Sequence, residues 1–185
     1  MSTTITDLMD PARGRALQAT LGLPVTLEAG EPLPPFFHHV HFWEVLPPAQ
    51  LGRDGHPAVT GPVAEAGLVR RMWAGGRLDW HGPLRAGIPA ERRTTRSDPA
   101  FKEGRTGRLA FVTLTHEYRQ DGALCLTERQ DLVYREPPDP AAPARPAPDA
   151  PPGEVAGRIE PATVLLFRYS ALILYGHRIH YDETY

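Results

Sequence analysis

A proline-rich segment constrains how this chain of 185 residues can fold. Residues 137–152 contain eight prolines, and each proline lacks a backbone N–H and fixes φ at about −65°. Such a run favours neither a helix nor the interior of a sheet, and it predicts an extended, semi-rigid linker. We therefore expect a folded domain at residues 1–136, a linker at 137–152, and a segment at 153–185 that is too short to bury a core alone.

The residues before the linker predict an α+β domain with a long antiparallel hairpin. Asp10 is a suitable N-cap and Pro11 a suitable first helical residue, so a helix is expected from there to Thr20. Gln120-Asp121-Gly122 is typical of a hairpin loop, and Gly75-Gly76 indicates a bend or bulge. The expected strands are residues 36–46, 69–81, 88–96, 109–119 and 124–135.

Composition and charge exclude several classes of protein. The formal net charge of −2 argues against general nucleic-acid binding, which needs a clear basic excess. No stretch approaches 18 apolar residues, so we expect no membrane span, and the N-terminus lacks the apolar core of a secretory signal. Cys125 is the one cysteine, so it is expected to be a small buried hydrophobic residue. We expect a cytoplasmic protein without a cofactor.

The C-terminal stretch, residues 163–182, carries the strongest chemical signal. Its first part is an apolar run with the composition of a buried strand or of a helix end, and it breaks at Gly176. His177 and His180 follow, and a turn after a buried strand is a common place for a general acid or base. Three alternatives remain open: loop histidines bonded to the backbone, one core histidine, or metal ligands together with Asp182.

A second group of histidines lies at residues 38, 39 and 41. In a strand, His39 and His41 would share one face and His38 would lie on the other. The three imidazoles would therefore not converge, and no metal site is expected there. The lack of a basic excess makes Trp73, Trp80 and Tyr118 core or pocket-wall residues and not a platform for stacked bases.

Several separate motifs, in the same order along the chain, resemble the MaoC-like double hotdog proteins. Within that family they are most similar to the fungal fatty-acid-synthase-like dehydratases, which include mesaconyl-C4-CoA hydratases and type 2 hydroxyacyl-thioester dehydratases. The motifs are His41-Phe42-Trp43-Glu44-Val45, Arg70-Arg71-Met72-Trp73-Ala74-Gly75-Gly76, Glu128-Arg129-Gln130-Asp131-Leu132-Val133-Tyr134-Arg135, Phe167-Arg168-Tyr169-Ser170-Ala171-Leu172 and Gly176-His177-Arg178-Ile179-His180-Tyr181-Asp182.

The resemblance implies two hotdog folds, each a curved antiparallel sheet around a helix, with residues 153–185 as the opening strand and catalytic turn of a second, incomplete hotdog. It implies hydration or dehydration of an enoyl or 3-hydroxyacyl thioester of CoA or acyl carrier protein. His180 would be the acid/base, and Tyr175 occupies the position where the family has a water-holding Asp or Asn. The expected substrate-binding residues are Gly176, His177, Arg70, Arg71 and Trp73; for the two arginines, contact with CoA phosphates and a solvated strand end both remain open.

Three functions are therefore open. The first is a hydratase or dehydratase that uses His180. The second is a non-catalytic hotdog module that binds acyl thioesters or supports a partner chain, which the phenol of Tyr175 favours because it carries no carboxylate. The third is a thioesterase, although no Asp or Glu is clearly aimed at a thioester carbon. Hotdog sheets associate edge to edge, so a homo-oligomer or a partner hotdog subunit is expected.

Overall fold

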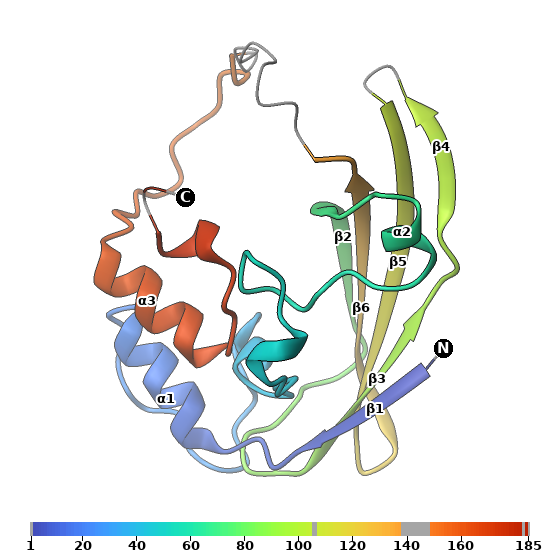
Figure 1. Ribbon diagram of the computed structural model, residues 1–185. Helices are drawn as coiled ribbons and strands as arrows, with labels where there is room; N and C mark the ends of the chain where they lie inside the picture. The colour runs from blue at the N-terminus through green and yellow to red at the C-terminus, as the bar shows by residue number, and fades with distance from the viewer. Residues whose placement is uncertain (1, 105–106, 138–148, 183, 185) are drawn as a thin grey trace.

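The computed structural model describes residues 2–104, 107–137, 149–182 and 184. Six antiparallel strands form one twisted sheet, and two helices lie together on one side of it (Figure 1). The order across the sheet is β1-β3-β5-β6-β2, and β4 pairs with β5. The strands are β1 (Ser2–Asp7), β2 (Arg70–Trp80), β3 (Ala90–Arg96), β4 (Ala100–Gly104), β5 (Gly107–Gln120) and β6 (Ala123–Arg135).

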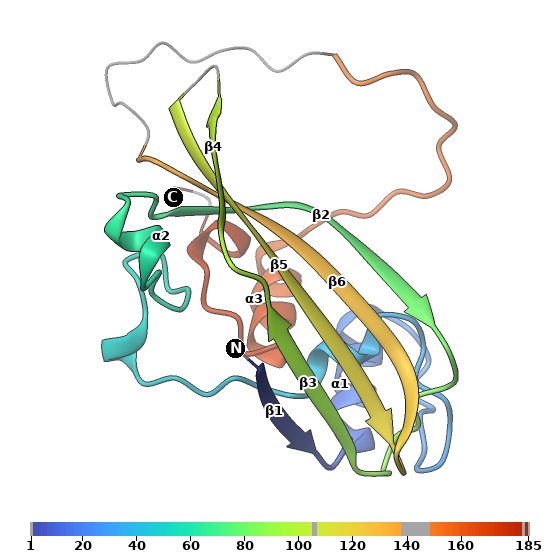
Figure 2. The same cartoon turned by 90° about the vertical axis from the view of Figure 1, so that its right-hand side faces the viewer.

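The hairpin of β5 and β6 is the longest pairing of the sheet and confirms the sequence prediction. Asp121 and Gly122 connect the strands, and both have positive φ (49° and 79°), which suits the right-handed twist of a two-residue hairpin. Both strands run diagonally across the view in Figure 2, curling as they cross. The predicted irregularity in β2 is also present, as a register shift between Trp73 and Gly75.

Helix α1 (Pro11–Thr20) begins and ends where the sequence predicts. The side chain of Asp10 caps it by accepting a hydrogen bond from the amide of Ala12 at 2.8 Å. Its buried residues include Leu17 and Gln18, and the Gln18 Oε1 accepts hydrogen bonds from the amides of Thr26 and Leu27, both at 3.1 Å. Gln18 thus anchors the segment that returns from the helix.

Asp7 joins the end of β1 to the start of α1. Its carboxylate accepts hydrogen bonds from the amides of Met9 (2.7 Å) and Phe42 (3.0 Å) and pairs with Arg13 at 2.9 Å and His41 at 3.2 Å. Burial alone would raise the pKa of Asp7, but these donors hold it well below its usual range. Strand β1 was not predicted from the sequence, and neither was β4.

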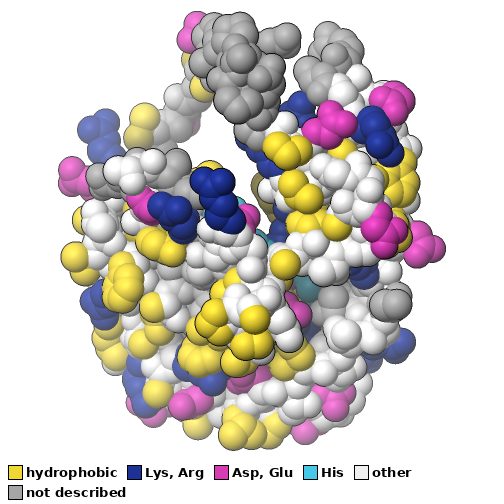
Figure 3. Space-filling view, in the orientation of Figure 1, with side chains coloured by type: hydrophobic (Ala, Val, Ile, Leu, Met, Phe, Trp, Pro, Cys, Tyr) yellow, Lys and Arg dark blue, Asp and Glu magenta, His cyan; other side chains and the backbone are white. Residues whose placement is uncertain are grey.

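The apolar run near the C-terminus forms a helix, so the prediction of an opening strand is wrong. Helix α3 (Thr163–Leu172) packs beside α1, and the indole Nε1 of Trp43 donates a hydrogen bond to the carbonyl of Leu172 at 3.0 Å. Val164 and Phe167 remain 68% and 64% exposed, and hydrophobic side chains are visible over this side of the molecule in Figure 3. The composition left a strand and a helix end open and the resemblance implied a strand, whereas the structure has a helix packed against α1.

The prediction of a strand at residues 36–46 is also wrong. Phe37–Val40 is a turn of 3₁₀ helix, and the flanking Phe36 and Phe42 have positive φ values of 69° and 56°. These two backbone conformations are incompatible with an extended strand. Residues 50–66 form the predicted loop, with short helical turns at Pro48–Gln50 and Pro62–Glu65 (α2).

The buried residues form two apolar clusters on the inner face of the sheet. The larger one includes Met9, Phe42 and Leu126 and extends to Cys125, which is buried as predicted. The smaller one lies under α2 and includes Val63 and Leu68. In the described residues no helix has the length and apolar character needed to cross a membrane. Most of the expected linker, residues 138–148, lies outside the described residues.

Candidate active site

The C-terminal turn docks on a loop from the first third of the chain. Gly55, with φ of 81°, touches Gly176 backbone to backbone, and a Cβ added to Gly176 would lie 2.8 Å from the Gly55 carbonyl oxygen. The amide of Arg178 donates to the carbonyl of Asp54 at 2.9 Å, and the Nε2 of His177 lies 3.4 Å from an Asp54 carboxylate oxygen. The loop and the turn therefore form one unit, and glycine is required on both sides of the contact.

Four rings gather on this unit. Tyr175 contacts His56 edge-on at 5.1 Å between ring centroids and lies 5.2 Å from His180. His177 lies 5.8 Å from His180 and 5.9 Å from His56. The structure thus brings Tyr175, His177 and His180 together, as the sequence predicted, and adds His56. The sequence analysis noted His56 only within a Gly-His-Pro loop break.

The environment sets the charges of this cluster. Burial, together with the Arg71 guanidinium, lowers the pKa of His56 to about 4, so that ring is neutral and its Nδ1 accepts a hydrogen bond from Arg71. The His180 side chain is exposed, and its partial burial together with the neighbouring His177 lowers its pKa, so the ring is mostly neutral near pH 7 and can accept a proton. Burial raises the pKa of Tyr175, so its phenol keeps its proton and can donate it in a hydrogen bond.

The residues of β2 that the sequence singled out lie in different environments. Arg71 points to the cluster through His56. Arg70, one residue away, alternates to the other face of the strand and is exposed. Trp73 is 68% exposed, with its indole over Gly76, and Trp80 is 45% exposed. Of the two expectations for these tryptophans, core or pocket wall, exposure contradicts the core, while Tyr118 is buried as expected.

Asp182 and His177 both have hydrogen-bond partners within the turn itself. Asp182 is bound by the guanidinium of Arg178 at 2.6 and 3.0 Å, which holds the pKa of the Asp182 carboxyl at about 2. Its partner is thus an arginine within the same turn. His177 Nδ1 accepts a hydrogen bond from the amide of Ile179 at 3.2 Å, so one of these histidines is a loop histidine bonded to the backbone.

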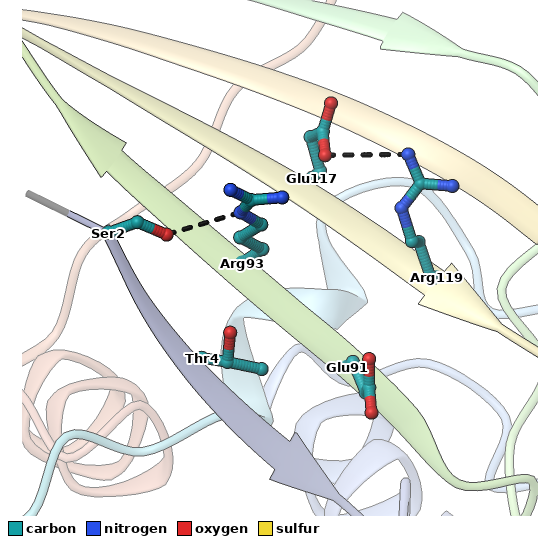
Figure 4. A pocket seen from close by; sticks show the side chains of 6 residues that line it. All are labelled: Ser2, Thr4, Glu91, Arg93, Glu117 and Arg119. Carbon is teal, nitrogen blue, oxygen red and sulfur yellow. Dashed lines mark hydrogen bonds and ion pairs between the residues drawn. The ribbon is translucent and has the colours of Figure 1, made fainter. Parts of the chain in front are cut away.

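Two surface hollows lie away from this turn. One, of about 430 Å³, runs between α1 and α3 and is bordered by Trp43, Phe167 and Leu172. The other, of about 410 Å³, lies on the outer face of β1, β3 and β5, where Arg93 donates to the Ser2 hydroxyl and Arg119 pairs with Glu117 (Figure 4). The second hollow is lined by charged side chains and matches no prediction.

A second polar cluster is buried between the 3₁₀ turn and the sheet. Glu128 accepts hydrogen bonds from the Tyr118 hydroxyl and the Gln130 amide, both at 2.8 Å. His38 and His39 each have Nε2 at 3.4 Å from one of its oxygens. Burial would raise the pKa of Glu128, yet the two imidazoles hold it well below its usual range. The expectation that these histidines do not converge is wrong, because they lie on a 3₁₀ turn and not on a strand.

The curved antiparallel sheet against helices α1 and α3 defines an α+β protein of the hotdog class. The chain belongs to the hydroxyacyl-thioester dehydratase type 2 family, whose model matches residues 36–185. It is similar to the mesaconyl-C(4)-CoA hydratase of Chloroflexus aurantiacus, with 42% identity over 176 residues. That alignment covers 94% of this chain and 61% of the relative.

Solved structures support the fold assignment. HtdX of Mycobacterium tuberculosis superposes with a TM-score of 0.58 at 17% identity, covering all of this chain and 65% of that one. The ChsH1–ChsH2 complex of the same organism gives 0.55 at 12% identity, with 76% of this chain and 86% of that chain covered. The chain thus spans about 61% of the length of the hydratase and 65% of that of HtdX.

Proposed function

We propose that this chain takes part in the addition or removal of water at an enoyl or 3-hydroxyacyl thioester carried by CoA or acyl carrier protein. Membership of the hydroxyacyl-thioester dehydratase type 2 family supports the reaction class. The observation that carries the proposal is the meeting of Tyr175, His177 and His180 on the turn that docks against residues 52–57.

The reaction requires a base for water and a proton donor for the α-carbon. In hydration, the water oxygen bonds to the β-carbon, the C=C electron pair moves toward the thioester oxygen, and the α-carbon then takes up a proton. His180 has a lowered pKa and is largely neutral near pH 7, so it can take the proton of water. The same imidazole, once protonated, can return that proton to the α-carbon. Dehydration runs through the same steps in reverse.

Tyr175 supplies a hydrogen-bonding group beside that imidazole. A phenol can accept a hydrogen bond from water through its oxygen and donate one through its proton. The ring is held edge-on by His56, 5.1 Å away, and Arg71 in turn binds His56. These contacts from Arg71 to His56 to Tyr175 fix the phenol in place, and we infer that Tyr175 orients the water that His180 activates.

The test mixes the protein with an enoyl-CoA and measures the fall in absorbance of the conjugated thioester. Mesaconyl-CoA is the first substrate to try, because the similar protein of Chloroflexus aurantiacus is a mesaconyl-C(4)-CoA hydratase. His180→Ala should abolish turnover. The matched control is His81→Ala, since His81 is an exposed histidine bonded to Thr127. Tyr175→Asn, which introduces a smaller amide, should retain or raise turnover. Wild-type activity that survives in His180→Ala would refute the assignment of the base.

A second candidate is a non-catalytic hotdog module that binds acyl thioesters or supports a catalytic partner. Two observations favour it: the bulk of Tyr175 beside His180, and the exposure of Trp73 on the edge strand β2. Here neither the wild type nor Tyr175→Asn would turn over substrate, while a CoA thioester would still raise the melting temperature. Appearance of free CoA without water addition would instead indicate a thioesterase.

The domain boundaries at 136 and 153, the linker between them, a second hotdog beginning after it and a cytoplasmic location remain proposals. So does association with another hotdog chain or a second copy. The exposed edge of β2 supports association, because an unpaired strand offers backbone donors and acceptors to another sheet. Light scattering of the purified protein would give its mass in solution, and a monomer at micromolar concentration would contradict this proposal.

A further inference from the structure

Three potential metal ligands converge between the 3₁₀ turn and the sheet. The ligand nitrogens of His38 and His39 and a carboxylate oxygen of Glu128 all lie within 4.8 Å of one another. His38 Nε2 is 3.4 Å from one Glu128 oxygen, and His39 Nε2 is 3.4 Å from the other. Neighbouring side chains on a 3₁₀ turn normally diverge by about 120°. The two rings nevertheless lie only 4.1 Å apart.

The contacts of the two imidazoles with Glu128 are long for hydrogen bonds, although that of His39 is still within hydrogen-bond range. An N–H···O hydrogen bond is about 2.9 Å long. Two ligands of a tetrahedral zinc ion, each about 2.05 Å from the metal, lie about 3.3 Å apart. Each observed distance of 3.4 Å, from His38 Nε2 to one Glu128 oxygen and from His39 Nε2 to the other, is close to the second value. The cluster thus has the separations of a site with room for an ion between its ligands.

His38 provides an independent observation. It is 1% exposed, and neither of its ring nitrogens makes a hydrogen bond. A buried polar atom without a partner is costly, and native proteins rarely leave one. Its ring lies beside Trp80 and Tyr118, both edge-on, which confines it in the cluster. A metal ion bound at Nε2 would satisfy the nitrogen that faces Glu128.

The surroundings of Glu128 have the features of a supported ligand. Tyr118 donates a hydrogen bond to one carboxylate oxygen and Gln130 to the other, and each oxygen retains a further lone pair. Such outer contacts orient ligating carboxylates in metal sites. The His39 side chain is 32% exposed, whereas those of His38 and Glu128 are 1% and 6% exposed. An ion can therefore reach the site from the side of His39.

We propose that His38, His39 and Glu128 bind one divalent transition-metal ion of the zinc type, with a solvent molecule as a fourth ligand. Two imidazoles and one carboxylate are a ligand set that zinc accepts. The site is built from the 3₁₀ turn and β6, while the ring cluster of the proposed acid/base belongs to residues 52–57 and 175–180. The two clusters therefore share no residue.

The test uses the full chain without a histidine tag, stripped of metal by a chelator. Zn²⁺ is titrated in competition with a chromophoric indicator, and Co²⁺ is added separately to record its visible absorption. We expect about one equivalent of tight binding, intense tetrahedral Co²⁺ bands, and a higher melting temperature with Zn²⁺. His39→Ala should weaken binding by about 100-fold or more. This variant is chosen because His39 is partly exposed and its loss disturbs the core least.

His177→Ala is the matched control, because it removes a histidine from the other cluster. It should leave binding, the Co²⁺ spectrum and the melting shift unchanged. Glu128→Gln, which keeps the shape of the side chain, should weaken binding as His39→Ala does, so the proposal stays testable if either variant folds poorly. Absence of binding in the wild type, or binding that is lost in His177→Ala and retained in His39→Ala, would overturn the proposal.

Discussion

Gly55→Ala tests whether the C-terminal turn is held by the loop at residues 52–57. At φ of 81° any residue other than glycine costs about 1 kcal/mol, and the new Cβ would meet the carbonyl of Gly176. The turn must then move away. It would lose the hydrogen bond from the Arg178 amide to Asp54, about 1 kcal/mol, and the ring contact of Tyr175 with His56, again about 1 kcal/mol. Undocking should therefore become easier by about 2 kcal/mol, or about 30-fold.

Gly67→Ala is the matched control for this variant. Gly67 has a similar φ of 76°, but a Cβ there would meet no atom within 4 Å. Gly67→Ala should therefore destabilise the protein only through the cost of a positive φ at alanine. Hydrogen exchange by mass spectrometry on a peptide spanning residues 173–182 measures the difference, because exchange of the Arg178 amide requires undocking. Equal protection in the two variants would refute the claim that the glycine contact holds the turn.

Three further predictions concern stability and pH. Leu126→Ala, at a fully buried position, should lower the free energy of unfolding by about 2–5 kcal/mol, while Leu8→Ala, at a 73% exposed position, should change it by less than about 0.5 kcal/mol in urea denaturation. The pKa of Asp7 is lower in the folded protein than in the unfolded chain, where it is near 4, so ionised Asp7 stabilises the fold above about pH 4. This stabilisation is lost as the pH falls toward the folded-state pKa. Asp7→Asn should therefore make the free energy of unfolding depend less on pH in the acid range. If His180 is the base, hydration should rise with pH and level off with an apparent pKa below 6.5, and a rate that falls over that range would contradict the assignment.

The elements that the sequence predicts well are those that neighbouring residues determine. The Asp10-Pro11 pair sets the start of α1, and Asp121-Gly122 sets the turn between β5 and β6. In each case residues close together in the sequence determine the backbone conformation, so it can be predicted without knowing any distant contact. The proximity of His177 to His180 is likewise local.

The failures occur where distant contacts decide the backbone. Phe42 adopts a positive φ of 56° while its amide is bound by Asp7, which lies 35 residues earlier. That contact converts an apparent strand into a turn and brings His38 and His39 to one carboxylate. His56 was missed as a site residue for the same reason: it reaches Tyr175 only after two loops far apart in the sequence have docked.

The contact between Gly55 and Gly176 has a consequence for how the chain can vary. It closes a loop of about 120 residues, and the entropy of closing so long a loop changes slowly with length, by about 0.6 kcal/mol for each doubling. Adding or deleting several residues between the two glycines should therefore change the entropy of closing this loop only slightly. The identity of the two glycines matters far more than the length of chain between them, because a Cβ on either would meet the backbone of the other.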